Sequence, residues 1–329
     1  TFIYAVPLMI VALAGVFAER SGIINLALEG IMIFGAFVGV LFVRLMQQAH
    51  VFDAAKAAGN WLAMQGFELL AMLVAALFGA IFSLLLSFAS VNLRADQTIG
   101  GTALNLLAPA LVLFLIRIIA NQNTLQMATG DSASWFMIKK TTLGFAKTDD
   151  LGFLGTTLLH KVYLATYICI LIFVVLSILL YKTRFGLRLR ACGENPQAAD
   201  SLGINVYKMR YAGVVISGAL GAIGGMAYIV PPVQTWNFEV GVAGAGFLAM
   251  AVMIFGQWKP FNICAAAMFF AVFKSLANIA DSTFLAQLHW SSNIYNMMPF
   301  IASMIILAFT SKNSMAPKAE GIPYDKGSR

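Results

Sequence analysis

The sequence predicts an all-α membrane protein, built as a polytopic bundle of transmembrane helices. Of its 329 residues, 60% are hydrophobic and only 11% are charged, and the mean hydropathy is +0.84. A soluble globular chain carries about a quarter charged residues. The apolar residues also gather in runs long enough to cross about 30 Å of hydrocarbon. Composition and run length together therefore place the chain in a membrane.

Hydropathy predicts about nine such spans, within a range of roughly eight to ten. They cover residues 2–18, 23–43, 67–90, 99–119, 162–181, 209–230, 242–257, 261–280 and 293–310. No break between them separates a second unit, so we expect a single transmembrane domain over residues 1–329. The first run lacks the basic start and small-residue exit of a cleavable signal, and it is expected to be a retained span.

Two apolar segments far apart in the chain are similar. LAMAVMIFGQW (248–258) matches LALEGIMIFGAF (26–37) with one residue fewer. The alternating topology runs these segments in opposite directions. Inverted repeats of this kind enclose a substrate path near the midplane of many transporters. The sequence therefore predicts two inverted repeats.

A polar segment, residues 182–210, lies between two apolar runs and carries cations at both edges. These cations are Lys182, Arg184, Arg188, Arg190, Lys208 and Arg210. Lys and Arg close to membrane spans retain a loop in the cytoplasm. The loop is therefore expected on the cytoplasmic side. Because successive spans cross the membrane in alternating directions, this placement predicts an outside N-terminus, an inside C-terminus and a polar external loop over 121–161. Retention of inner loops also explains the net charge of +7, so no nucleic-acid partner is expected.

A short helix, Pro196 to Leu202, is predicted inside this loop. Asn195 suits the N-cap, Pro196 the first helical position and Gly203 the left-handed stop. Ala198, Ala199 and Leu202 give the helix a face of small and apolar side chains, which would fit closely into a groove. Such a short helix needs a partner surface. The alternative is a solvated loop whose charges only fix the topology.

Asn25 and Glu29 stand four residues apart in the predicted second span, so a helix would place both on one face. Asn105 follows in the fourth span, and Lys274 and Asn278 stand one turn apart in the eighth. Polar side chains inside a span usually face a bundle interior or a watered path. We expect these five residues to line a substrate path. Hydrogen bonds that only hold the bundle together, or a snorkelling lysine, are the alternatives.

Glycine spacing marks two further features. Gly213, Ser217, Gly221 and Gly225 recur every four residues and predict close helix packing. Gly241, Gly244 and Gly246 precede the short seventh run, which is typical of a broken helix.

Catalytic and metal sites are not expected. The three cysteines stand singly, without the spacing of a metal site or a disulfide framework. No G-x-x-x-x-G-K-[ST] phosphate loop occurs, so ATP hydrolysis would have to take place on another chain. The sequence therefore predicts a transport subunit rather than an enzyme.

GLRLRACGENPQAADSLGI (186–204) resembles the cytoplasmic loop of the ABC-importer permeases that serve simple sugars, nucleosides and branched-chain amino acids. ERSGIINLALEG (19–30) looks like the nucleoside branch of that family. The resemblance implies a coupling helix that contacts a partner ATPase, with Arg188, Arg190, Gly193, Glu194, Asn195, Pro196, Ala198, Ala199, Leu202 and Gly203 as the coupling residues.

The same resemblance implies the partner proteins of this chain. The expected partners are an ABC ATPase with two nucleotide-binding domains, a second non-identical permease and an extracellular substrate-binding lipoprotein. ATP and Mg would bind to the ATPase, and no cofactor to this chain. The expected location is the bacterial cell membrane, and the expected substrate is a nucleoside.

Two alternatives remain at this point. A permease of the same family could carry branched-chain amino acids or simple sugars. An ion-coupled secondary transporter would need carboxylates in its spans, and Glu29 is the clear mid-span acid in the sequence. Such a transporter would have no use for a loop, such as 182–210, that docks an ATPase.

Overall fold

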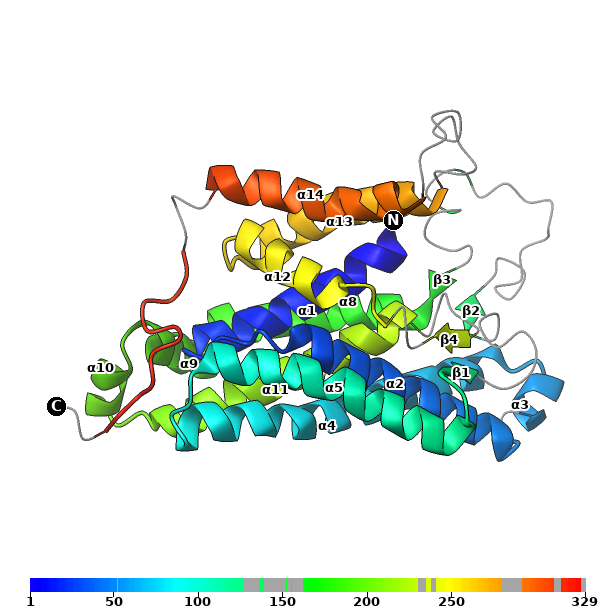
Figure 1. Ribbon diagram of the computed structural model, residues 1–329, viewed down its shortest axis with the longest axis horizontal. Coiled ribbons are helices and arrows are strands. Elements are labelled where there is room, and N and C mark those ends of the chain that lie inside the picture. The colour runs from blue at the N-terminus through cyan, green and yellow to red at the C-terminus, as the bar shows by residue number, and fades with distance from the viewer. Residues whose placement is uncertain are drawn as a thin grey trace.

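The computed structural model describes residues 1–51, 53–126, 136–138, 152, 155, 162–229, 235–237, 241–279, 292–310 and 315–326. These residues form a bundle of long helices that lie side by side (Figure 1). The helices are α1 (Phe2–Arg20), α2 (Leu28–Gln48), α3 (Asp53–Ala57), α4 (Trp61–Ser87) continued by the π-helix η1 (Phe88–Asn92), α5 (Gln97–Ala120), α8 (Leu164–Lys182), α9 (Arg184–Glu194), α10 (Pro196–Ser201), α11 (Val206–Ile229), α12 (Ala245–Phe255), α13 (Pro260–Ile279) and α14 (Ser292–Thr310).

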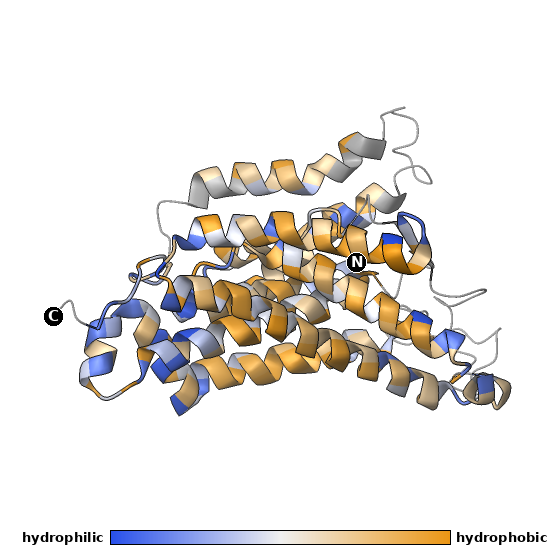
Figure 2. Ribbon diagram, turned by 60° about the horizontal axis from the view of Figure 1, so that its bottom comes forward, coloured by the Kyte–Doolittle hydropathy of each residue, from blue (hydrophilic) through white to orange (hydrophobic). Residues whose placement is uncertain are grey.

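Seven helices in the described part of the chain are long and apolar enough to cross a membrane: α1, α2, α4 with η1, α5, α8, α11 and α13. Apolar residues cover their length, and polar residues concentrate at the ends of the bundle (Figure 2). This arrangement, with the composition, makes the protein a multi-pass membrane protein. The expected span 242–257 contains only α12, whose 11 residues reach about 16 Å at 1.5 Å per residue. That helix alone is too short to cross.

Helix α11 occupies the middle of the bundle and packs against α1, α2 and α4. Its small residues allow this. A Cβ atom added to Gly225 would lie 2.0 Å from the carbonyl oxygen of Met32, and one added to Gly213 would lie 2.6 Å from the Ser21 side chain. The predicted packing role of the small-residue stripe is confirmed.

Helix α2 begins later than the sequence predicted. Residues 23–27 precede it in a non-helical stretch, so Asn25 and Glu29 do not share a helix face, and that prediction is wrong. The reason is hydrogen bonding to side chains, one of them distant in the sequence. The Asn25 side-chain oxygen accepts from the Ala27 amide, and the Ile24 amide donates to the side-chain oxygen of Gln97. These backbone amides are therefore satisfied without a helix.

Helix α12 follows a turn, Gly241–Gly244, in which Gly241, Ala243 and Gly244 have positive φ angles of 52°, 53° and 74°. The Gly-rich segment therefore starts a short helix, as its composition predicted. The two similar apolar segments do not hold equivalent places in their helices. Gly35 lies inside α2, whereas Gly256 ends α12.

Four short strands depart from the all-α expectation. Strand β1 (Thr124–Gln126) pairs antiparallel with β4 (Thr235–Asn237), and β2 (Met137–Ile138) pairs with β3 (Val162–Tyr163). Such pairing satisfies backbone groups that leave the helices. Most of the predicted external loop 121–161, and the surface helix considered for it, lies outside the described residues.

Helices α9 and α10 and the tail segment 315–326 gather at the end of the bundle that is on the left in Figure 1. We call it the docking end. The strands and α3 lie at the opposite end.

Candidate coupling region and substrate path

The short helix α10 has the ends that the sequence predicted. The Asn195 side chain accepts a hydrogen bond from the Ala198 amide at 3.0 Å, and Pro196 occupies the first helical position. Gly203 has a φ of 79° just beyond the helix. These features confirm the helix and its caps, with the end at Ser201 instead of Leu202.

The two alanines of α10 face in different directions. Ala199 is only 2% exposed and packs with Cys192, Val206 and Tyr324. Ala198 is exposed, and Leu202 is 81% exposed. The prediction that both alanines belong to one docking face is therefore wrong for Ala199, because consecutive helical residues point about 100° apart. The outer face consists of Ala198 and Leu202.

Helix α9 joins α8 to α10. Its N-cap is Thr183, whose hydroxyl accepts from the Gly186 amide at 3.3 Å. Arg190 lies over the Tyr181 ring, with its guanidinium carbon 5.0 Å from the ring centroid, whereas Arg188 is exposed. Burial raises the pKa of the Cys192 thiol to about 11, which disfavours the thiolate form.

The end of α9 meets the corner between α1 and α2. Arg20 donates to Glu194 at 3.2 Å, in an ion pair whose Arg20 side chain is 12% exposed. A Cβ atom on Gly193 would lie 2.4 Å from the carbonyl oxygen of Arg20, so this close approach requires glycine. The two stretches that carry the sequence resemblance thus contact each other.

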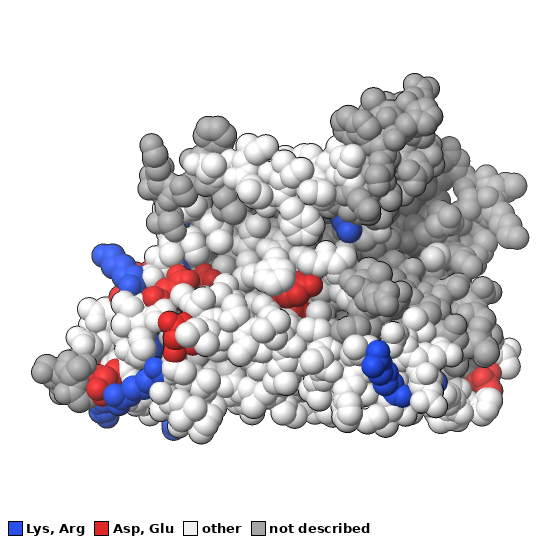
Figure 3. Space-filling model, viewed as in Figure 1, with Lys and Arg blue, Asp and Glu red and all other residues white. Residues whose placement is uncertain are grey.

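Charged side chains gather at this end of the molecule and are sparse along the middle of the face in Figure 3. A buried cation also lies at this end: Arg210 of α11 is only 1% exposed. Its guanidinium donates to the carbonyl oxygen of Ile322 at 3.0 Å and lies next to Gly22.

In the bundle interior, the Asn25 amide donates to the Ser217 hydroxyl of α11 at 2.8 Å. Asn25 is 1% exposed, and its side-chain oxygen accepts a hydrogen bond from the Ala27 amide. In this conformation the Asn25 side chain therefore links the α1–α2 corner to α11. This is the alternative that the sequence left open, a hydrogen bond that holds the bundle together.

The side chain of Glu29, a residue of α2, caps the N-terminus of the short helix α12. Its two carboxylate oxygens accept from the amides of Gly244 at 3.1 Å and Gly246 at 2.7 Å. A carboxylate is favourable here because the free amides and the helix dipole both present positive charge. Glu29 is not fully buried, unlike Asn25.

Asn105 of α5 supports the same segment from the other side. Its carbonyl oxygen accepts from the Gly30 amide at 2.8 Å, and its amide donates to the Leu26 carbonyl at 2.6 Å. The two hydrogen bonds replace those that the start of α2 cannot make for itself.

Lys274 lies apart from these residues, in a narrow crevice lined by Leu8, Tyr228, Leu248 and Phe300. The crevice also includes Ala243 and Ala245, so Lys274 and Glu29 both border the start of α12. The side chain of Asn278 lies outside the described residues.

The sequence offered little signal for several other polar residues. The Trp258 indole donates to Glu19 at 2.5 Å, in a turn where Gln257 and Trp258 have φ angles of 52° and 55°. Glu68 in α4 is fully buried. Tyr324 lies in a tail for which the sequence predicts only a cytoplasmic location, although a Pro-Tyr-Asp sequence in a polar tail is a visible signal.

Comparison with known proteins identifies the family. The family model described as the branched-chain amino acid transport system permease component matches residues 1–308. The chain belongs to this family. The permease is 39% identical over 330 residues to the guanosine ABC transporter permease protein NupQ of Bacillus subtilis, covering 100% of this chain and 96% of that protein.

A second relative, the nucleoside ABC transporter permease protein NupC of Lactococcus lactis, is 38% identical over 325 residues, or 98% of the permease and 95% of that protein. An uncharacterized protein of Mycoplasma genitalium is 31% identical over 331 residues. No solved structure matches the chain. The family and these relatives make the permease a transport component and not an enzyme.

Proposed function

We propose that the permease is the membrane subunit of an ATP-driven importer that moves nucleosides into the cytoplasm. The substrate class rests on the relatives named for guanosine and for nucleosides, which are 38–39% identical to nearly the whole chain. Similarity over the full length covers both the docking end and the bundle interior, so it is not confined to one shared motif.

The observation that supports coupling is the contact between α9 and the α1–α2 corner. Through Arg20–Glu194 and the Gly193 approach, a displacement of α9 and α10 would reach the corner that leads to Glu29. The proposed coupling residues are the ten named from the sequence. Of these, Ala198 and Leu202 offer direct contact, and Ala199 holds the helix from inside.

The partners in this proposal are an ABC ATPase with two nucleotide-binding domains, a second non-identical permease and an extracellular substrate-binding lipoprotein. ATP and Mg would bind to the ATPase. The docking end, which includes tail residues 315–326, would face the cytoplasm of a bacterial cell, as the cations of 182–210 indicate.

The finer architecture belongs to the same proposal. One permease domain over 1–329 would have about nine spans if the pieces around α12 and the helix α14 complete two more crossings. Inverted repeats are supported by the non-helical backbone before both α2 and α12, although the similar segments themselves are offset. Glu29, Asn105, Lys274, Asn278 and Asn25 would border or support the path.

The test is transport by the purified complex in vesicles. ATP inside vesicles whose lumen holds the ATPase side of the complex should drive uptake of labelled guanosine or cytidine. An ionophore should not stop this uptake. Uptake of leucine or glucose instead would favour the family's other substrate classes. Uptake that an ionophore abolishes would favour an ion-coupled transporter and contradict the proposal.

A further inference from the structure

We propose that residues 315–326 form a strap that positions the coupling helix α10 against the helix corners of the bundle. This inference rests on the proposed function, because it gives the strap a part in coupling. The strap is the segment that crosses the docking end after α14. Its contacts reach α9, α10 and α11, the α12–α13 turn and the corner between η1 and α5.

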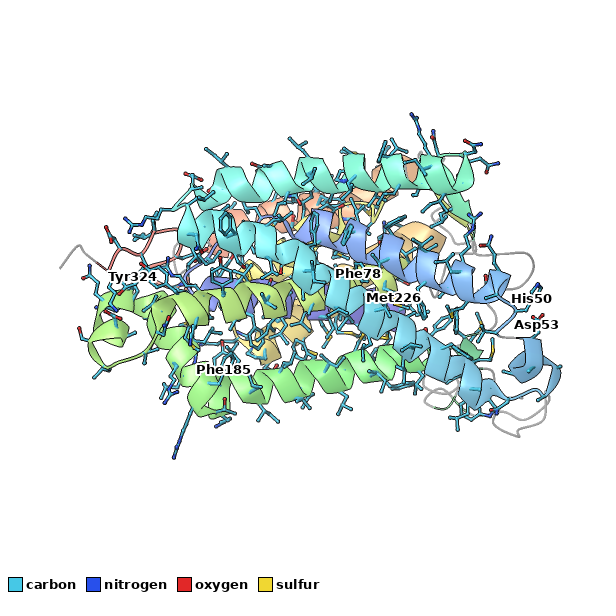
Figure 4. All side chains as sticks on the ribbon, turned by 90° about the horizontal axis from the view of Figure 1, so that it is seen from below. His50, Asp53, Phe78, Phe185, Met226 and Tyr324 are labelled. Atoms are coloured by element: carbon cyan, nitrogen blue, oxygen red, sulfur yellow. The ribbon has the colours of Figure 1, made fainter. Side chains whose placement is uncertain are left out.

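Tyr324 anchors the strap beneath α10. It is 5% exposed and packs in one cluster with Cys192 of α9, Ala199 of α10 and Val206 of α11. Its ring meets that of Tyr207 edge to face, with centroids 5.3 Å apart. Figure 4 places Tyr324 at the docking end, far from His50 and Asp53 at the other end. The inner side of α10 therefore packs on a strap residue.

Arg210 ties the strap to α11. It donates to the Ile322 carbonyl at 3.0 Å, and its guanidinium carbon lies 6.0 Å from the centre of the Tyr324 ring. Within the described residues, its Nε and Nη2 atoms have no hydrogen-bond partner. A buried guanidinium with so few acceptors depends strongly on those it has. Loss of the strap would remove the carbonyl and uncover the cation.

The strap is also fixed along its length. The Met315 amide donates to Gln257 in the α12–α13 turn at 3.0 Å, and the Ala319 amide donates to the Gly193 carbonyl at 2.9 Å. Asp325 accepts two hydrogen bonds from Arg94, at 2.9 and 3.0 Å, at the corner between η1 and α5. The segment thus links α9 to turns on both sides of the bundle.

Helix α10 needs this support because its six residues cannot form a stable helix alone. Beside it, a hollow of about 340 Å³ is lined by Asn195, Gln197, Ala198, Ser201, Tyr324 and Asp325, among others. A protein that docks on the outer face of α10 would therefore also meet the strap. Force applied there would be shared with the corners that the strap contacts.

The test uses the complete transporter, with Tyr324→Ala as the main variant and Lys318→Ala, an exposed strap residue, as the matched control. We expect Tyr324→Ala to reduce nucleoside-stimulated ATP hydrolysis about tenfold, within the usual range of coupling between sites, while basal hydrolysis stays near wild type. Tyr324→Phe should keep stimulation near the wild-type level, because it retains the ring that packs against α10 and Tyr207.

Charge exchange at the end of the strap keeps the test decisive if Tyr324→Ala fails to assemble. Arg94→Asp and Asp325→Arg should each reduce stimulation, and the double variant should recover it. Normal stimulation in Tyr324→Ala and in both single charge variants would overturn the strap. Wild-type complex that shows no nucleoside stimulation at all would instead contradict the proposed function.

Discussion

At the residue scale, Glu29 illustrates how a polar side chain inside a span is used. It supplies two acceptors to the backbone of another helix, 215 and 217 residues further along the chain. Its carboxylate joins α2 to α12 at the place where α12 has no helical partner for its first amides. The residue therefore has a structural role in the bundle, and it is partly exposed, unlike the buried Asn25.

We expect Glu29→Ala to destabilise the permease by about 2–4 kcal/mol, because it leaves the Gly244 and Gly246 amides without acceptors. Glu29→Gln keeps one good acceptor and should cost less. Thermal unfolding of the detergent-solubilised protein measures both. Equal stability of wild type and Glu29→Ala would show that the two hydrogen bonds contribute nothing.

Glu68 presents a different case. It is fully buried in α4, where the backbone amide of Ala165 lies near its carboxyl group. Burying an isolated charge costs several kcal/mol or more, so a neutral side chain of the same shape is favoured. Glu68→Gln is expected to leave stability and transport near wild type, whereas Glu68→Lys should prevent accumulation of the folded permease. Expression and size-exclusion profiles compare them directly, and a folded Glu68→Lys protein would count against this assignment.

At the element scale, the two sides of α10 predict opposite outcomes of mutation. Leu202→Glu places a charge on the exposed face and should abolish nucleoside-stimulated ATP hydrolysis, with normal amounts of permease in the membrane. Ala199→Leu overfills the inner cluster and should destabilise the protein by about 1–3 kcal/mol. Ile322→Glu is the control, because Ile322 is also an exposed apolar side chain at this end (56%). Normal nucleoside-stimulated ATP hydrolysis in Leu202→Glu would show that this face of α10 does not contact the ATPase.

The strap is also expected to respond to pH. Burial raises the pKa of Glu320 to about 7, from an ordinary value of 4.5, although the nearby Arg20 cation opposes this. The carboxyl group of Glu19 lies close enough to interact with it, and Arg20 also pairs with Glu194. The bound strap therefore holds the Glu320 proton more tightly than a released strap would.

It follows that attachment is strongest below the ordinary value and weakens as pH rises through about 7. Hydrogen exchange of 315–326, corrected for the intrinsic rate, should be faster at about pH 8 than at about pH 5. Glu320→Gln should remove the difference. Exchange that does not change with pH in the wild type would rule out this titration.

At the scale of the whole molecule, the described asparagines and glutamate that border the proposed path have few hydrogen-bonding atoms left for a substrate. Asn25 and Asn105 already have internal partners for both their donor and their acceptor, and Glu29 binds two amides. A tight nucleoside site usually needs several converging polar groups. We therefore expect weak binding in the passage, with selectivity supplied by the proposed external binding protein.

Calorimetric titration of nucleosides into the complex without its binding protein should show affinity in the high micromolar range or weaker. A dissociation constant of about 1 µM, equivalent to about 8 kcal/mol of binding free energy, would contradict this expectation. Asn105 and Glu29 would then be re-examined as recognition groups. A titration of the isolated binding protein serves as the positive control.

The sequence alone determined the membrane location, the helical class, the position of most helices and the caps of α10. These features depend on local composition and on hydrogen bonds between neighbours in the chain, such as Asn195 to Ala198. The stripe from Gly213 to Gly225 likewise predicted close packing, because small residues at helical spacing have few other uses.

Only the tertiary structure decided which polar groups meet. The partners of Glu29 lie more than two hundred residues away, and those of Tyr324 come from three other helices. The non-helical start before α2 depends on Gln97 and Asn105 from α5, which satisfy backbone groups that a helix would otherwise pair. The inward direction of Ala199 follows from the strap beneath it. No local pattern contains these facts, because the energy of a buried polar group is set by whichever distant group reaches it.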